Sequence, residues 1–286
     1  MKYIDLIRQQ VPRLDGHDSM FNRSWYYENL QNKPSLLIVA GDSWTWGDCL
    51  LGIDPEAGMA DHPDRNKINY GGLLSAKLDA DYINLSQCGS SNLTIIEALT
   101  ALISQCKNDY SKIDVVFTMT ENFRELIPTQ SWIPAEYNSL PEFFINYEKN
   151  MFLDIAKLID DYPTVKFHIS RNFTYSFDEN KPLLKGSHLD RTWVDCLHDH
   201  QEIFLYPVNT RVVSGIALDP LYDYISQNKI LEKYGEQYLD YFRSARMAIT
   251  WLMTSKLNCK KATKHPTEQG HEVWANYLYD QITNDV

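Results

Sequence analysis

Residues 35–41 read Ser-Leu-Leu-Ile-Val-Ala-Gly, and a polar pair, Asp42-Ser43, follows them directly. The block is continuously apolar, which is typical of a strand in a sheet that helices cover on both faces. Strand-like runs recur farther along the chain, at 81–86, 113–119 and 164–170. Helical patterns separate these runs, at 92–106 and around 142–159. This alternation predicts an α/β fold built on a parallel sheet.

The ends of the predicted helices can be placed from capping residues. Asn92 is the expected N-cap of the helix at 92–106, because its side chain can accept a hydrogen bond from the first turn. The last helix is expected to begin at Pro266, since proline is favoured at the first helical position. Residues 221–257 also have a helical composition, with an expected break at Gly235.

The polar residues that follow the four predicted strands are expected to share one edge of the sheet. They are found at 41–43, 86–89, 120–122 and 170–172. The carboxyl ends of parallel strands meet at one edge, and ligands bind there in open α/β sheets. Arg171 and Asn172 belong to this edge, where a contact with substrate and a surface ion pair are both consistent with the pattern.

The composition excludes several classes of protein. The chain has 286 residues with 27 basic and 38 acidic side chains, so its formal net charge is −11. A general attraction to nucleic acid or to a membrane is not expected, because both require a clustered basic surface. The five cysteines are scattered and form no Cys-x-x-Cys pair, which argues against a disulfide scaffold or a thiolate zinc site. Without a signal peptide or an apolar run of about 20 residues, a reducing, cytoplasmic or virion-associated location is expected.

Residues 173–220 are the hardest part of the sequence to assign. Prolines, glycines and polar clusters interrupt this stretch, and only 202–208 has a strand-like pattern. A long irregular stretch of this kind is expected to be an excursion near the site, such as a lid or a substrate wall.

The motif Gly41-Asp42-Ser43-Trp-Thr-Trp-Gly47 stands at the end of the first predicted strand. A serine on a tight strand-to-helix turn exposes its hydroxyl, and its own N–H can face an anion. The pattern Gly-Asp-Ser-x-x-x-Gly resembles the first sequence block of the SGNH (GDSL-like) hydrolase family. This resemblance implies that Ser43 is the nucleophile and that its N–H is an oxyanion donor. The alternative is a capped turn without reactivity.

A histidine near the other end of the chain resembles the family's last block, in which the catalytic histidine precedes the C-terminal helix. His265 stands in that position, followed by Pro266. A neutral imidazole there can take the proton from Ser43 and return it to a leaving alcohol. His271 is a second candidate, but it falls inside the expected helix, where a partly buried or surface histidine is the alternative. Position favours His265.

The intermediate blocks match less well. Gly89 resembles the second-block glycine whose N–H approaches the oxyanion, although a plain turn glycine is the alternative. Asn122 alone matches the third block, Gly-x-Asn-Asp, and the resemblance gives its amide an oxyanion role. Ala262 stands where the family's Asp-x-x-His has its acid. A backbone carbonyl near Ala262, a carboxylate from elsewhere, or a slow or inactive enzyme would each account for this departure.

The resemblance implies a three-layer α/β/α, flavodoxin-like fold with a central parallel sheet. Residues 1–286 then form one domain, with 1–34 as an N-terminal extension and 173–220 as an insertion. The implied activity is that of a serine esterase that removes a short acyl group, acetyl above all, from a small-molecule or carbohydrate ester. The reaction passes through an acyl-serine and requires no metal or cofactor. The alternative is an inactive binding or assembly module, and the oligomeric state is left open.

Further candidates surround this core of the site. Trp44 and Trp46 flank the nucleophile turn, and aromatic faces at a rim can stack on sugar rings. With Arg171 they are candidate substrate-binding residues, and packing in the core is the alternative for the aromatic pair. His198 and His200 are metal-ligating residue types, but this pair needs a third ligand from elsewhere. Solvated loop histidines are the alternative there.

Overall fold

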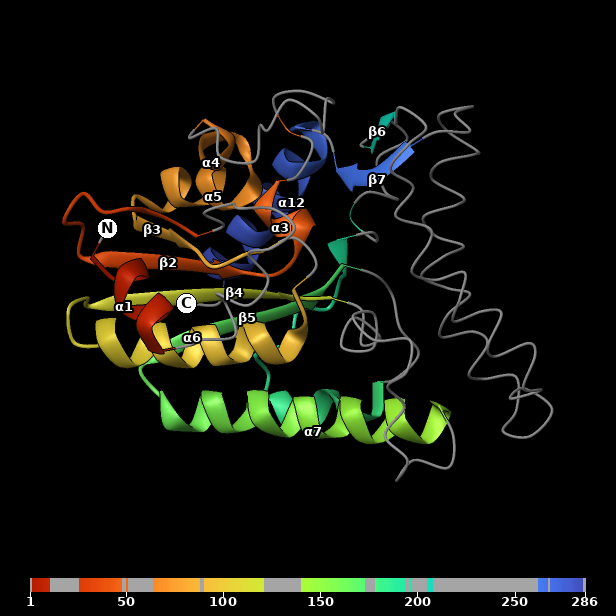
Figure 1. Ribbon diagram of the computed structural model, residues 1–286. Coiled ribbons are helices and arrows are strands. Elements are labelled where there is room, and N and C mark those ends of the chain that lie inside the picture. The colour runs from red at the N-terminus through yellow and green to blue at the C-terminus, as the bar shows by residue number, and fades with distance from the viewer. Residues whose placement is uncertain are drawn as a thin grey trace.

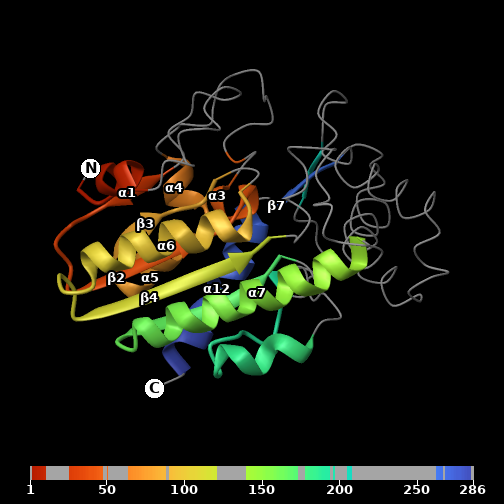
Figure 2. The same cartoon turned by 60° about the horizontal axis from the view of Figure 1, so that its bottom comes forward.

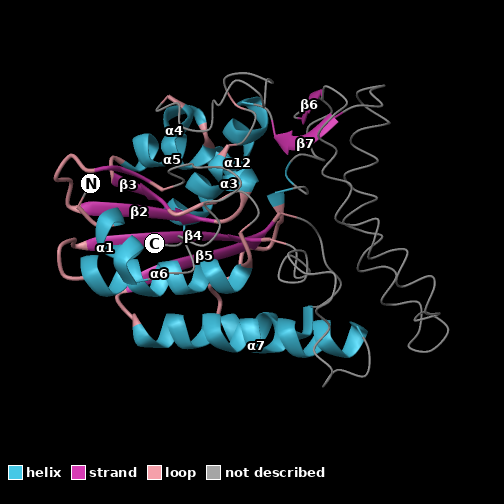
Figure 3. Ribbon diagram, in the orientation of Figure 1, coloured by secondary structure: helices cyan, strands magenta, loops and turns pink. Residues whose placement is uncertain are grey.

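The computed structural model describes the central sheet, the helices that cover it and residues at the carboxyl ends of its strands. The described residues are 2–10, 26–47, 50, 64–87, 90–120, 140–172, 178–193, 196, 205–207, 262–266 and 268–284. Figure 1 shows their arrangement, and Figure 3 separates helices from strands by colour. None of the helices among these residues is both long and apolar enough to cross a membrane.

Five strands form a mixed sheet in the order β1-β3-β2-β4-β5. Their bounds are β1 (Tyr27–Asn29), β2 (Ser35–Ala40), β3 (Asp81–Asn84), β4 (Lys112–Met119) and β5 (Val165–Arg171). Strands β3, β2, β4 and β5 are parallel, and β1 pairs antiparallel with β3. The predicted parallel α/β sheet is therefore confirmed, and β1 is an added edge strand.

Helices cover both faces of this sheet. One face carries α1 (Ile4–Gln10), α6 (Asn92–Cys106) and α7 (Leu140–Asp161), which Figure 2 brings to the front. The opposite face carries α5 (Tyr70–Leu78) and α12 (Glu268–Asn284), which contact each other. The shorter elements are α3 (Ser43–Trp46), α4 (Arg65–Ile68), the 3-10 helix η5 (Asp178–Leu184), β6 (Leu205–Pro207) and β7 (Ala262–Pro266). The result is the predicted three-layer α/β/α architecture.

The order of the strands decides where a site can form. The chain leaves β2 through α5 to reach β3 on one side, and it later crosses through α6 to reach β4 on the other side of β2. The carboxyl ends of β2 and β4 therefore flank the point where the direction of winding reverses. Crevices at this point are the usual ligand sites of doubly wound sheets.

The hydrophobic core lies between the sheet and the face formed by α1, α6 and α7. Leu36, Ile38 and Ala40 of β2 are fully or almost fully buried, as the continuous apolar block predicts. The helix-period stripe of α6 meets them through Ile95, Leu99 and other apolar side chains. Burial of this apolar surface is the main stabilising term of the fold.

Two predicted helix starts are corrected by the structure. Ser91 caps α6, because its Oγ accepts a hydrogen bond from the N–H of Thr94 at 3.3 Å. Asn92 is the first residue of the helix, and its side chain bonds to the backbone of Thr120 instead. Pro266 belongs to β7, which pairs antiparallel with β6, and α12 is described from Glu268. A proline has no N–H to donate to a ladder, so the end of a strand suits it as well as the start of a helix.

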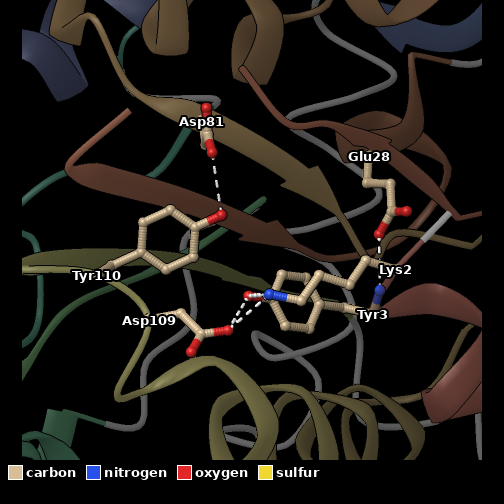
Figure 4. Close-up of polar contacts among 6 residues, drawn as sticks. All are labelled: Lys2, Tyr3, Glu28, Asp81, Asp109 and Tyr110. Carbon is tan, nitrogen blue, oxygen red and sulfur yellow. Dashed lines mark hydrogen bonds and ion pairs between the residues drawn. The ribbon is translucent and has the colours of Figure 1, made fainter. Parts of the chain in front are cut away.

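The first residues of the chain are tied to the rest of the domain (Figure 4). A Glu28 carboxylate oxygen accepts the N–H of Tyr3 at 3.0 Å and thereby anchors the start of α1. The Tyr3 hydroxyl and the Lys2 ammonium both donate to Asp109, and these bonds lower the pKa of that carboxyl. Asp81, the first residue of β3, accepts a hydrogen bond from the Tyr110 hydroxyl at 3.0 Å.

Residues 187–189, within the stretch 173–220, follow the outer edge of the sheet. The N–H of Ile169 donates to the carbonyl of Ser187 at 2.7 Å, and the N–H of Leu189 donates to the carbonyl of Ile169 at 2.7 Å. The chain there lengthens the sheet beyond β5 by one short bridge. Trp193, which follows, is fully buried, and its Nε1 donates to the Gly270 carbonyl in α12. Residues 178–193 therefore belong to the body of the domain.

Asp114, near the amino end of β4, provides a test of the fold that is independent of the site. Burial raises its pKa, but a hydrogen bond with His168 Nε2 at 3.2 Å and an ion pair with Lys112 at 2.9 Å outweigh burial and lower it overall. A carboxyl whose folded pKa is lowered stabilises the protein above its unfolded pKa, and this contribution is lost as pH falls through the folded pKa.

We expect Asp114→Asn to lower the free energy of unfolding by about 1–3 kcal/mol at pH 7, since it removes the charge from a buried hydrogen-bonded group. The difference between wild type and variant should stay constant down to the ordinary pKa of 3.8 and shrink below it. Urea unfolding at a series of pH values measures this difference. A difference that persists unchanged to pH values well below the ordinary pKa would contradict the assignment.

Candidate active site

The turn after β2 is shaped by two glycines. A Cβ on Gly41 would lie 2.2 Å from Thr45 Oγ1, which is closer than real Cβ atoms approach. Gly47 ends α3 with φ at 82°, in the left-handed region that favours glycine, and its N–H donates to the Ser43 carbonyl at 3.1 Å. The motif Gly-Asp-Ser-x-x-x-Gly therefore begins directly after β2. It forms a single helical turn, which ends at Gly47.

Ser43 is the first residue of this helical turn. Its side chain stands at the carboxyl end of β2, beside the point where the winding reverses, and 8% of its surface is exposed. The predicted common edge of the strands is confirmed for the described residues. The N–H of Gln87, after β3, donates to the Gly41 carbonyl at 3.3 Å, and the N–H of Asn172, after β5, donates to the Met119 carbonyl at 3.2 Å.

Asp42 directly precedes Ser43 in the chain, and its side chain is fully buried. Its Oδ1 caps α3 by accepting the N–H of Trp44 at 2.9 Å, and it also accepts the side-chain amide of Asn172 at 3.0 Å. Its Oδ2 accepts the Thr120 hydroxyl at 3.0 Å. Donors from the ends of β4 and β5 thus converge on one carboxylate.

Thr120 is itself held by the side chain of Asn92. Asn92 Nδ2 donates to the Thr120 carbonyl at 3.0 Å, and Asn92 Oδ1 accepts the Thr120 N–H at 2.9 Å. This two-bond pairing explains why Asn92 faces the sheet edge while Ser91 caps the helix. The sequence pattern identified Asn92 as a polar helix start but could not identify its partner.

Two of the predicted oxyanion donors, Gly89 and Asn122, lie outside the described residues. The described residues that precede each of them lie at the predicted edge of the sheet. Ser86 begins the loop that leads to Gly89, and its N–H donates to Asn84 Oδ1 at 2.9 Å. Thr120 stands two residues before Asn122. The oxyanion roles of Gly89, Asn122 and the Ser43 N–H stay predictions.

The predicted general base, His265, lies in β7, and this strand contacts α3 (Figure 1). The antiparallel pairing of β7 with β6 places this position in a strand before the C-terminal helix. Segments from the two ends of the chain therefore meet beside Ser43. The imidazole of His265 lies outside the described part of the chain, so its hydrogen bond with Ser43 stays a prediction.

His271, the alternative base, is fully buried, where a partly buried or surface position was expected. Its Nδ1 accepts the N–H of Tyr70 at 3.1 Å. A neutral imidazole with its acceptor at Nδ1 carries its hydrogen on Nε2. Aromatic rings surround it, with the Trp193 ring at 5.0 Å and the Tyr70 ring stacked at 6.2 Å. This tautomer has no lone pair left to accept a serine proton.

The three predicted substrate-binding residues make contacts within the protein. Trp44 is 3% exposed and meets the Trp193 ring edge-on at 5.4 Å, and Trp46 is buried in the core. Arg171 donates to Glu148 at 2.9 Å and lies over the ring of Phe152. The ion pair considered for Arg171 is therefore buried rather than on the surface. A substrate contact by any of these three residues stays a prediction.

The histidines of the stretch 173–220 include the metal-ligating residue types considered above. His198 and His200 lie outside the described residues. Within the described ranges, no group of three or more His, Cys, Asp or Glu side chains is arranged to hold a metal ion. His188 there faces Asp190 at 3.9 Å.

No family model and no curated protein match the chain in sequence. Among solved structures, it is similar to a carbohydrate esterase family 2 enzyme with a carbohydrate-binding domain from Myceliophthora fergusii. The identity is 13%, the match covers 90% of this chain and 68% of that one, and the TM-score is 0.43. A family two carbohydrate esterase from Clostridium thermocellum matches with 12% identity, 88% and 65% coverage and a TM-score of 0.41.

A third similar structure is that of a Bacteroides fragilis protein named as an acylhydrolase. It matches with 12% identity over 94% of this chain and 96% of its own, at a TM-score of 0.34. At these low identities and TM-scores, the function of the chain has to be inferred from its own residues.

Proposed function

We propose that the chain is a serine esterase of the SGNH type that hydrolyses a short acyl ester. One observation carries the proposal: Ser43 begins a tight helical turn at the carboxyl end of β2, and the strand that carries His265 contacts that turn. The buried Asp42 beneath Ser43 supports it, since three hydrogen bonds to its carboxylate keep the turn in one conformation.

The reaction would proceed in two steps. Ser43 Oγ attacks the ester carbonyl carbon while His265 takes the hydroxyl proton, and N–H donors stabilise the oxyanion that forms. The bond to the alcohol then breaks, and the alcohol leaves with the proton from His265. Water attacks the acyl-serine in the same way, and this step releases the carboxylic acid and restores Ser43.

We propose acetyl as the acyl group and a carbohydrate as the alcohol, following the family resemblance. The small exposure of Ser43 supports a small acyl group, because a bulky chain would need a wider approach to the hydroxyl. Stacking on Trp44 and Trp46 gains no support, because both rings are buried among protein side chains.

A chain-length series with a chelator arm tests the proposal. We expect p-nitrophenyl acetate and acetylated sugars to be hydrolysed with kcat/KM roughly tenfold or more above that for the octanoyl ester, since a small acyl group reaches the little-exposed Ser43 hydroxyl more easily than a long one. Activity should be unchanged by EDTA. Preference for octanoyl esters would contradict the acetyl assignment, and loss of activity with EDTA would favour a metal site at His198 and His200.

An inactive binding module is the second candidate, and Ala262 favours it. A catalytic histidine normally has a carboxylate partner, and the position that supplies it in the family holds alanine here. This candidate predicts binding of an acylated carbohydrate without its turnover. Equilibrium binding by wild type, together with unchanged ester after prolonged incubation, would identify it.

A further inference from the structure

Asp42 collects hydrogen bonds from parts of the chain that are far apart in sequence. Asn172 lies 130 positions away and Thr120 lies 78 positions away, yet both donate to its carboxylate. Asp42, Thr120 and Asn172 are each at most 1% exposed. The three side chains form a fully enclosed cluster under the first turn of α3, and we call them the Asp42 cluster.

We propose that Thr120 and Asn172 are positioning residues of the esterase, acting through Asp42 to fix the direction of Ser43 Oγ. The inference rests on the proposed function and adds two residues that the motif does not contain. Asp42 Oδ1 caps α3 through the N–H of Trp44, so a rotation of the carboxylate would break the bond that fixes the start of the helical turn on which Ser43 lies. Donors on both carboxylate oxygens prevent that rotation.

The orientation of Asn172 supports a role in positioning rather than in stability alone. Because a carboxylate only accepts hydrogen bonds, the Asn172 amide must present its NH2 group to Asp42. Its Oδ1 is then turned away, and it is buried without a hydrogen-bond partner among the described residues. A buried oxygen without a hydrogen bond lowers the stability of the fold. Asparagine at this position therefore keeps its bond to Asp42 at a cost in stability.

Thr120 is fixed from the other side. The two hydrogen bonds with Asn92 hold its backbone N–H and carbonyl, and its hydroxyl extends from this fixed backbone to donate to Asp42. The Asp42 cluster therefore joins the ends of β2, β4 and β5 to the start of α6. Small displacements of a nucleophile from its reactive geometry can reduce the rate roughly a hundredfold.

The test compares matched variants at both positions. Thr120→Val removes the hydroxyl at constant shape, Thr120→Ser retains it, and Asn172→Ala removes the amide. Asp114→Asn is the control, because it breaks the contacts of another buried carboxylate toward the amino end of β4. The measurements are kcat and KM for p-nitrophenyl acetate, the rate at which a fluorophosphonate labels Ser43, and the melting temperature.

We expect Thr120→Val and Asn172→Ala to lower kcat and the labelling rate roughly tenfold to a hundredfold, with KM little changed. Thr120→Ser should recover most of the wild-type rate, and Asp114→Asn should lower the melting temperature without slowing labelling. Rates near wild type in both Thr120→Val and Asn172→Ala, at whatever melting temperature, would overturn the positioning role. If wild type itself is not labelled, the proposed function fails and the positioning role fails with it.

Discussion

Replacing Ser43 with alanine is expected to reduce ester hydrolysis roughly ten-thousand-fold or more, to the level of the uncatalysed reaction or close to it. The substitution removes the oxygen that is proposed to bond to the acyl group in the first step. Melting temperature should change far less than activity, because the substitution removes a single oxygen atom from a side chain that is 8% exposed. Initial rates with p-nitrophenyl acetate measure the effect.

Ser75→Ala is the matched control for this prediction. Ser75 has the same 8% exposure as Ser43, and its Oγ donates to the Gly72 carbonyl within α5, away from the turn. The Ser75 variant should hydrolyse the ester at the wild-type rate. Equal rates for wild type, Ser43→Ala and Ser75→Ala would show that Ser43 is not the nucleophile.

Replacing His265 with alanine is expected to lower kcat roughly a thousandfold, because Ser43 then loses its proton acceptor and the leaving alcohol loses its proton donor. The fold should persist, since His265 lies in the short strand β7 outside the five-stranded sheet. Rates measured at several pH values, together with melting temperature, separate loss of chemistry from loss of structure.

His271→Asn is the matched control for the histidine. An asparagine oxygen can accept the Tyr70 N–H in place of Nδ1, although the aromatic contacts of the ring are lost. We expect a lower melting temperature and a kcat within severalfold of wild type. The reverse result, with His271→Asn inactive and His265→Ala active, would move the general base to α12 and contradict the tautomer that the structure indicates.

The sheet and its functional edge could be predicted because both follow from local patterns. A continuous apolar block followed by Gly41-Asp42-Ser43 predicts a buried parallel strand with a polar turn at its carboxyl end. The same reasoning placed Thr120 and Asn172 on the edge, since parallel strands bring their carboxyl ends together. The short strand β1 was missed, because three residues are too few for a periodic pattern.

The contacts within the site could not be predicted, because they join residues far apart in sequence. Nothing near Asn172 indicates a bond to Asp42, and a rim position alone made substrate contact a reasonable expectation. Trp44 and Trp46 could not be assigned to rim or core from the sequence, because an aromatic side chain suits either place. Trp44 and Trp193 are buried together with His271, where α3, α5 and α12 meet on one side of the sheet, and Trp46 is buried in the core cluster.

Alanine at position 262, where the family has an acid, is expected to lower the rate of ester hydrolysis without changing the type of reaction. A backbone carbonyl can accept the Nδ1 hydrogen of His265 and select the useful tautomer, but it supplies no negative charge to stabilise the imidazolium. A Ser-His pair without a carboxylate is therefore expected to act more slowly than a full triad. The Asp42 cluster serves Ser43 instead, by holding its helical turn.

Mass-spectrometric mapping of a fluorophosphonate adduct tests most directly whether Ser43 is a nucleophile activated by His265. We predict one adduct on the peptide that contains Ser43 in folded wild type, and labelling roughly a hundredfold slower or more in His265→Ala. Absence of an adduct on Ser43 in folded wild type, or equal labelling rates with and without the His265 imidazole, would contradict the account.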